Sequence, residues 1–257
     1  MRALTDTWTM AKRSLRHTTR SMDTIITVVL MPIALMLLFV YVFGGALGAQ
    51  TSVDYIDFLT PGVVIMTVIS GIAYAAFRLA MDMQKGIISR FRTMPVRPSS
   101  VLSGQALSST VSNALSCVLV VVVAFLIGFR PVPDAGAWVL AAGLVLLFIL
   151  ATTWLAMFFG LLARTVEGAG AFSYILFLLI FISPSFVPTD SMAPWLQSFA
   201  ENQPLTPIVD TIRSLLTDGT PGPRFWVALA WAIGILVVSY ALALVAYRRS
   251  DPPQAVA

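Results

Sequence analysis

Six long apolar runs constrain the fold of this 257-residue chain more than any other feature of its sequence. An apolar run of about 18 residues is long enough to cross the hydrocarbon core of a bilayer as a helix. Hydrophobic residues make up 58% of the chain and charged residues 11%, against about 45–50% and about 25% in soluble domains. The sequence therefore predicts an all-α integral membrane protein, one domain over residues 1–257. Its six predicted transmembrane helices are 25–46, 58–80, 105–128, 137–161, 171–187 and 225–247.

The basic residues gather on one side of the predicted spans. Thirteen of the 16 Lys and Arg residues lie before the first span, near the loops after spans two and four, or after the last span. Only Arg130, Arg213 and Arg224 fall on the other side. Lys and Arg in short loops mark the cytoplasmic side, so both termini are expected there, in a bacterial plasma membrane. The same rule accounts for the basic pI of about 9.6 without nucleic-acid binding.

The first 24 residues predict an amphipathic helix on the inner leaflet ahead of the first span. Trp8 falls on an apolar stripe, while Lys12, Arg13 and Arg16 fall on the opposite side. Such a helix can anchor the chain to anionic lipid, or it can form part of a docking surface. Both roles stay open.

A basic loop punctuated by glycine and proline, residues 82–98, separates the second and third spans. Ile87, Ile88, Phe91 and Met94 recur at helical spacing, and an apolar stripe of this kind can fill a groove in a partner protein. Alternatively, the helix lies on the inner leaflet with its arginines on lipid phosphates. The residues alone favour neither interpretation.

Residues 188–224, on the outer side, predict two short helices in a re-entrant or surface-lying hairpin. Asp190 or Ser191 is the expected cap of the first helix, and Thr206 of the second, with Gly219 as its stop signal. Thr60 is the expected cap of the second span, followed by a proline.

Several kinds of chemistry are missing from the sequence. No aspartate, glutamate, lysine or histidine lies in the middle of a span, which disfavours an ion-coupled carrier. A phosphate-binding loop needs Gly-Lys-Ser/Thr, but Lys12 and Lys85 follow Ala11 and Gln84. Cys117, the single cysteine, is expected to be a small core residue. We therefore expect no catalytic residue, metal site or bound cofactor, and energy that comes from another polypeptide.

Two stretches of the chain resemble the permease subunits of ABC-2 type exporters, in particular the daunorubicin-resistance (DrrB-like) branch. The first is DMQKGIISRFRTMPVRPSSVLSGQ, residues 82–105, and the second is FVPTDSMAPWLQSFAENQPLTPIVDTIRSLLTDG, residues 186–219. The six spans and the amphipathic N-terminus extend the resemblance over nearly the whole chain. The sequence departs from the pattern at Ser89, where relatives often have an acidic residue.

The resemblance implies a permease dimer above a pair of separate ABC ATPase subunits, which hold ATP and Mg. The resemblance leaves open whether the dimer is a homodimer or a heterodimer of two different permeases. It also implies that the first cytoplasmic loop supplies a coupling helix that docks in the ATPase. The contact candidates are Lys85, Gly86, Ile87, Ile88, Arg90, Phe91, Arg92, Thr93, Met94, Pro95 and Arg97.

The function implied is export of a hydrophobic drug-like compound, natural product or lipid. Aromatic and thioether side chains suit a promiscuous apolar cavity. The expected cavity wall consists of Met66, Ser70, Tyr74, Phe77, Phe172 and Tyr174. Two alternatives stay open: a permease for a lipid-linked glycan or another lipid, and a non-transporting membrane scaffold or sensor.

Overall fold

The computed structural model describes residues 22–48, 54–85, 98–163, 165–189 and 192–249. Every regular element in these ranges is helical. The elements are α2 (Met22–Leu38), the π-helix η1 (Phe39–Phe43), α3 (Gly44–Gly48), α4 (Tyr55–Gln84), α6 (Pro98–Ile127), α7 (Ala135–Leu162), α8 (Val166–Gly170), α9 (Phe172–Ile182), α10 (Pro194–Asn202), α11 (Leu205–Thr217) and α12 (Phe225–Arg249). The predicted all-α architecture is confirmed.

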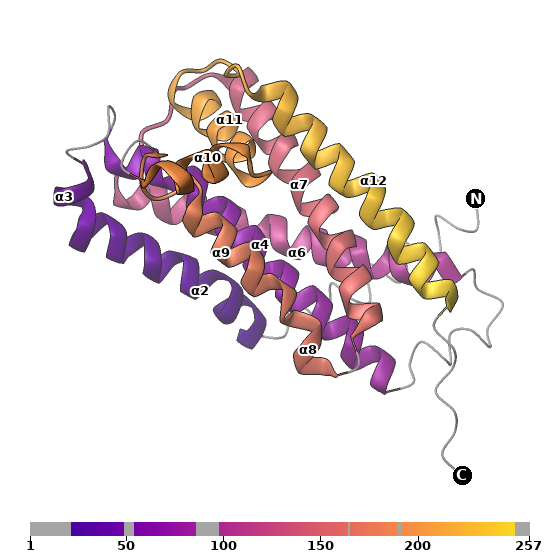
Figure 1. Ribbon diagram of the computed structural model, residues 1–257. Coiled ribbons are helices and arrows are strands. Elements are labelled where there is room, and N and C mark those ends of the chain that lie inside the picture. Colours follow the sequence, from indigo (N-terminus) through magenta and orange to yellow (C-terminus); the bar gives the residue numbers. More distant parts are fainter. Residues whose placement is uncertain (1–21, 49–53, 86–97, 164, 190–191, 250–257) are drawn as a thin grey trace, which may run out of the picture.

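The helices run between two ends of the bundle (Figure 1): α2, α6 and α9 run toward one end, and α4, α7 and α12 run toward the other. One end, called the α11 end here, holds α3, α10 and α11. The other, called the α8 end, holds α8 and the last turns of α4, α7 and α12. The predicted interfacial helix over residues 1–24 lies outside the described residues except for its last three, which belong to α2.

Among the described residues, five helical segments are long and apolar enough to cross a membrane. They are Val28–Ala46, Tyr55–Gln84, Leu102–Ile127, Ala135–Leu162 and Phe225–Tyr247. The predicted fifth span, 171–187, was too long, because α9 ends at Ile182 and has only 11 residues. The residue before a proline is disfavoured in the helical conformation, and Ser183 precedes Pro184 with an extended backbone. A full sixth crossing stays a prediction.

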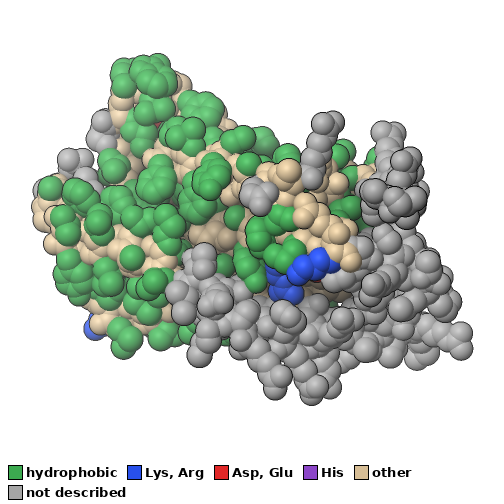
Figure 2. All heavy atoms as spheres, turned by 90° about the horizontal axis from the view of Figure 1, so that it is seen from below, with side chains coloured by type: hydrophobic (Ala, Val, Ile, Leu, Met, Phe, Trp, Pro, Cys, Tyr) green, Lys and Arg blue, Asp and Glu red, His purple; other side chains and the backbone are tan. Residues whose placement is uncertain are grey.

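Helix α4 forms the centre of the bundle. It packs against α2, α6, α7, α8, α9 and α11, and 67% of its most apolar window is buried, against 22% for the first and last candidate spans. Helix α12 instead packs along α7 at the edge. The described part of the face shown in Figure 2 is covered mainly by hydrophobic side chains, as expected for a surface that meets lipid.

The expected cap of the second span was wrong. Helix α4 begins at Tyr55, and Thr60 lies inside it, where its hydroxyl donates to the carbonyl of Ile56 at 2.7 Å. Threonine in a membrane helix can satisfy its own hydroxyl in this way. The helix therefore continues through Pro61 and extends to Gln84, beyond the predicted range of 58–80.

The two outer helices are present, but their expected caps were also wrong. Ala193 precedes α10, and a proline takes the first helical position, where a missing N–H costs nothing. Helix α11 begins at Leu205, so Thr206 lies within it and donates instead to the carbonyl of Ala200. The stop at Gly219 is confirmed by its positive φ of 70°. One face of α11 is apolar, and its residues Ile208, Val209, Ile212, Leu215 and Leu216 are buried.

Candidate functional site

The C-terminal end of α4 leads into the predicted coupling loop. Residues 82–84 belong to the helix rather than to the loop, and Lys85 is the C-cap residue. The Lys85 ammonium donates to the sulfur of Met81 at 3.2 Å, and its side chain is exposed. The other coupling candidates, from Gly86 to Arg97, lie outside the described residues and stay predictions.

One basic side chain in the last turns of α4 contacts an aromatic ring. The guanidinium of Arg78 lies 5.8 Å from the centroid of the Tyr74 ring. A cation over an aromatic face contributes about 0.5–1 kcal/mol at exposed sites. Tyr74, which was predicted to line a substrate cavity, therefore also helps to hold a basic residue at the α8 end.

The six predicted cavity residues differ in their surroundings. Met66 is fully buried in the core, and the Ser70 hydroxyl donates back to the Met66 carbonyl at 3.0 Å. Phe172 stacks on Phe159 of α7, with ring centroids 4.4 Å apart. Tyr174 is 75% exposed on α9. A cavity between two copies of the chain stays a prediction. Met66 faces the core of its own copy.

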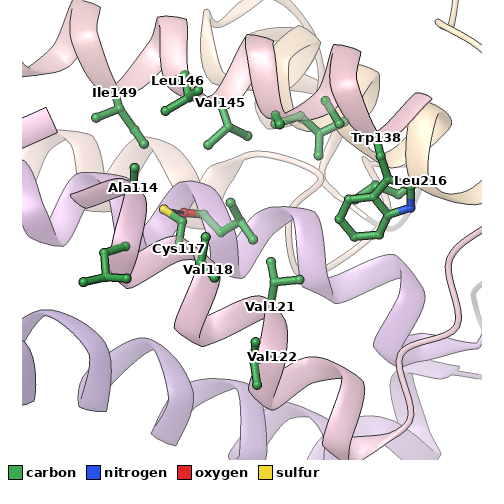
Figure 3. A pocket seen from close by; sticks show the side chains of 15 residues that line it. Ala114, Cys117, Val118, Val121, Val122, Trp138, Val145, Leu146, Ile149 and Leu216 are labelled. Carbon is green, nitrogen blue, oxygen red and sulfur yellow. Dashed lines mark hydrogen bonds between the residues drawn. The ribbon is translucent and has the colours of Figure 1, made fainter. Parts of the chain in front are cut away.

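A pocket that the sequence did not predict lies between α6 and α7 (Figure 3). Its volume is about 620 Å³, within the range of about 300–1,000 Å³ that is typical of small-molecule sites. Its walls come from α6 and α7, with contributions from α4 and α11. The lining residues are Val64, Ala114, Leu115, Cys117, Val118, Val121, Val122, Trp138, Ala141, Ala142, Val145, Leu146, Ile149, Ile212 and Leu216.

The floor of this pocket contains Cys117. Its thiol lies 3.9 Å from the carbonyl oxygen of Val64, and its side chain is buried, as predicted. Apart from the thiol and the indole N–H of Trp138, the lining side chains carry no polar group. A sequence signal existed in Ala114, Ala141 and Ala142, small residues among larger ones, but only the packing of the helices shows that they leave a space.

A polar residue of α6 packs this helix against α4. Asn113 of α6 is buried, and its Nδ2 donates to the carbonyl of Val68 at 3.0 Å. The partner helix approaches so closely that a Cβ at Gly71 would lie 2.5 Å from the Asn113 side chain. Small residues permit such close approach in membrane helices.

A charged network fixes α11 at its end of the bundle. Asp210 pairs with Arg213 and Arg224, each at 3.1 Å. Burial lowers the pKa of Arg213 to about 10, and the charge of Asp210 opposes this shift. Arg213 therefore remains charged at neutral pH. Burial likewise raises the pKa of Asp210, while the two arginines act to lower it.

Known proteins resemble the chain over most of its length. Residues 5–217 match the family described as ABC-2 type transporter. The daunorubicin resistance ABC transporter permease protein DrrB1 of Streptomyces coeruleorubidus is 31% identical over 233 residues, 88% of this chain and 80% of that protein. The probable doxorubicin resistance ABC transporter permease protein DrrC of Mycobacterium tuberculosis is 23% identical over 243 residues, 93% and 87% of the two chains.

The similarity also reaches beyond these two proteins. The putative transport permease ycf38 of Cyanophora paradoxa is 25% identical over 214 residues, 82% of this chain and 74% of that protein. The matched range includes five of the six predicted spans, and the described helices are long and apolar enough for several membrane crossings. The chain is therefore a multi-pass membrane protein that belongs to the ABC-2 type transporter family.

Proposed function

We propose that this chain is the permease subunit of an ATP-driven exporter of hydrophobic, drug-like compounds. The observation that carries the proposal is the family match over residues 5–217, together with 31% identity to a daunorubicin resistance permease. The absence of a Gly-Lys-Ser/Thr motif from the sequence supports a separate ATPase subunit that binds ATP and Mg. The complex would contain two ATPase subunits and a second permease, either a second copy of this chain or a different one.

Helix α4 is suited to carry motion from the ATPase into the bundle. It is continuous over 30 residues, from Tyr55 to Gln84, which at 1.5 Å per residue gives about 45 Å. Its C-terminal end immediately precedes the proposed coupling segment, and its other end packs against α11. A push on residues 86–97 would therefore reach the opposite end of the bundle through one central helix.

The transported compound would bind between two permeases. Tyr174 is exposed on α9, while Tyr74 and Phe77 are half-buried on α4, so these three residues remain available to a cavity wall. A compound shifts the equilibrium between the inward-facing and outward-facing states only if its affinity differs between them. The proposed wall therefore needs side chains that change neighbours between these states.

Reconstitution tests the coupling. The chain is purified together with its ATPase, and ATP hydrolysis is measured in liposomes with and without daunorubicin. We expect Arg90→Glu combined with Phe91→Ala to abolish complex formation and coupled hydrolysis. The matched control, Arg90→Lys with Phe91→Leu, keeps the charge and the apolar contact and should retain both. If the first double variant still assembles and hydrolyses normally, this segment is not the coupling element.

The same liposomes separate the remaining alternatives. A permease for a lipid or lipid-linked glycan would move a fluorescent lipid in an ATP-dependent manner and leave daunorubicin where it was added. A scaffold or sensor would show no ATP-linked flux of either compound. Accumulation of daunorubicin that depends on ATP supports the proposed drug exporter.

A further inference from the structure

The pocket between α6 and α7 has the length of a lipid tail. Trp138 and Ile149 mark its extent along α7, and the eleven helical steps between them correspond to about 16 Å. The hydrocarbon core of a bilayer is about 30 Å thick, so one leaflet provides about half of that depth. The pocket therefore matches the span of one acyl chain.

The pocket borders on side chains that face away from the bundle. Val118 is 56% exposed, Leu115 50% and Leu146 47%. These residues lie in helices that are long and apolar enough to cross a membrane, where exposed side chains meet lipid. An occupant can therefore enter from the bilayer without passing through water.

The lining favours plain hydrocarbon over a drug-like molecule. Anthracycline-type compounds carry hydroxyl, carbonyl and amine groups, and burying such a group without a hydrogen bond costs about 1–3 kcal/mol in proteins. The lining offers only the Cys117 thiol, which already faces the Val64 carbonyl, and the Trp138 indole. An acyl chain needs no polar partner.

The α11 end of the pocket supplies charges for a head group. Trp138 stacks on Phe125 at 6.0 Å, and Phe125 contacts Phe129 at 5.4 Å. Arg130 follows Phe129 and is exposed, and its Nη1 donates to the Phe129 carbonyl at 3.3 Å.

One carboxylate bonds to the main chain of Arg130, and a second belongs to the same loop. Asp57 accepts from the Arg130 main-chain N–H at 2.9 Å. Asp134 accepts from the main-chain N–H groups of Gly136 and Ala137 at the start of α7. A cation beside carboxylates complements a zwitterionic phosphate-amine head group.

We propose that this pocket binds one acyl chain of a zwitterionic phospholipid, with the lipid phosphate at Arg130. The lipid would fill the space between α6 and α7 and would contact α11 through Ile212 and Leu216. This role goes beyond the proposed export function, because occupancy needs neither ATP nor an ATPase. A failure of drug transport would therefore leave this proposal standing, and the reverse also holds.

Photo-crosslinking to the full-length purified chain tests the proposal. The protein is delipidated in mild detergent and titrated with phosphatidylethanolamine that carries a diazirine at the end of one acyl chain. Covalent lipid is then counted by intact-protein mass and located by peptide mapping. We expect one saturable adduct per chain on residues 114–122 or 141–149. Leu126 and Val139, which are exposed on the same helices but do not line the pocket, should stay unlabelled.

Two variants fill the pocket, and one serves as a matched control. Ala142→Trp and Leu146→Trp place a large ring at lining positions that are exposed and so tolerate volume. Each should lower the adduct yield about tenfold, which corresponds to about 1.4 kcal/mol of binding. Ala230→Trp, at an exposed position on α12 outside the pocket, should leave the yield unchanged.

A head-group variant completes the test. Arg130→Gln should weaken phospholipid binding about fivefold, the effect expected for one basic residue near a lipid surface, and leave binding of a diacylglycerol probe unchanged. Equal adduct yields in Ala142→Trp, Leu146→Trp and Ala230→Trp would overturn the acyl-chain site, as would labelling spread evenly over Leu126 and Val139. Competition by daunorubicin but not by unlabelled phospholipid would assign the pocket to the transported compound. Unchanged phospholipid binding in Arg130→Gln would overturn the placement of the phosphate.

Discussion

The side chain of Arg213 in α11 contacts both the main-chain carbonyl and the aromatic ring of Phe58 in α4. The Nε of Arg213 donates to the main-chain carbonyl of Phe58 at 3.1 Å, and its guanidinium lies 3.9 Å from the centroid of the Phe58 ring. The same guanidinium donates to the carbonyl of Pro184, in the turn that follows α9. One buried cation thus joins α11, the start of α4 and the end of α9.

Removal of this cation should loosen the α11 end. We expect Arg213→Met to lower the free energy of unfolding by about 2–3 kcal/mol, because hydrogen bonds to charged groups contribute about 1.5–3 kcal/mol and two main-chain carbonyls lose their donor. Thermal unfolding of the purified protein in detergent measures the change. Arg224→Met is the control, since Arg224 pairs with the same Asp210 but is more exposed, and its loss should cost less than about 1 kcal/mol. Equal losses in the two variants would contradict the structural role of Arg213.

The contact between α4 and α6 predicts a compensating pair of substitutions. Gly71→Ala should destabilise the protein by about 1–3 kcal/mol, because its Cβ would overlap the buried Asn113 side chain. Asn113→Ala removes that obstacle together with the hydrogen bond to Val68. The double variant should therefore lose less stability than the sum of the single variants. Thermal unfolding of all three measures this coupling, and strict additivity would show that the two helices are not in such close contact.

A second close approach, between α4 and the turn after α9, predicts a more severe effect. A Cβ at Gly62 would lie 2.7 Å from the main-chain oxygen and 3.0 Å from the Cα of Ser185. Backbone atoms cannot rotate away as a side chain can, so Gly62→Ala should destabilise the protein more than Gly71→Ala does. Gly45→Ala, which would meet no atom within 4 Å, is the control and should be nearly neutral. The comparison needs only melting temperatures in detergent, and a stable Gly62→Ala variant would refute this packing.

The orientation in the membrane can be measured with single cysteines. Because Cys117 is the only cysteine, Cys117→Ala gives a background without reactive thiols. In that background, Pro133→Cys at the α11 end should react with a membrane-impermeant maleimide in intact cells. Gln84→Cys at the α8 end should react only after permeabilisation, because the basic side of the chain is expected to be cytoplasmic. The opposite labelling pattern would mean that the chain is inserted the other way round.

Hydrophobicity predicted the membrane helices well, but their ends less well. A long apolar run has few alternatives to a helix in lipid, so α4, α6, α7 and α12 appear where their runs occur. Helix ends depend on which hydrogen bonds the packed bundle offers. Thr60 and Thr206 resemble N-cap residues in sequence, yet the first bonds within its helix and the second bonds to the neighbouring α10.

The functional surfaces were harder to predict than the helices. Asn113 is a polar residue in an apolar helix, and its role in packing α6 against α4 became visible only through its hydrogen bond to the Val68 carbonyl. The pocket between α6 and α7 has no motif, since it forms where small residues on two helices happen to face each other. The predicted cavity wall included Met66 because thioether side chains suit an apolar site, but this methionine is buried in the core.

Transport in inside-out vesicles tests the central claim most directly. Vesicles that contain this chain and its ATPase are incubated with doxorubicin, and the quenching of its fluorescence reports accumulation inside. We predict accumulation that requires ATP, the ATPase and this chain together, and that disappears with Arg90→Glu and Phe91→Ala but not with Arg90→Lys and Phe91→Leu. Accumulation that is equal with and without ATP, or that survives the first double variant, would contradict the account of an ATPase-driven drug exporter.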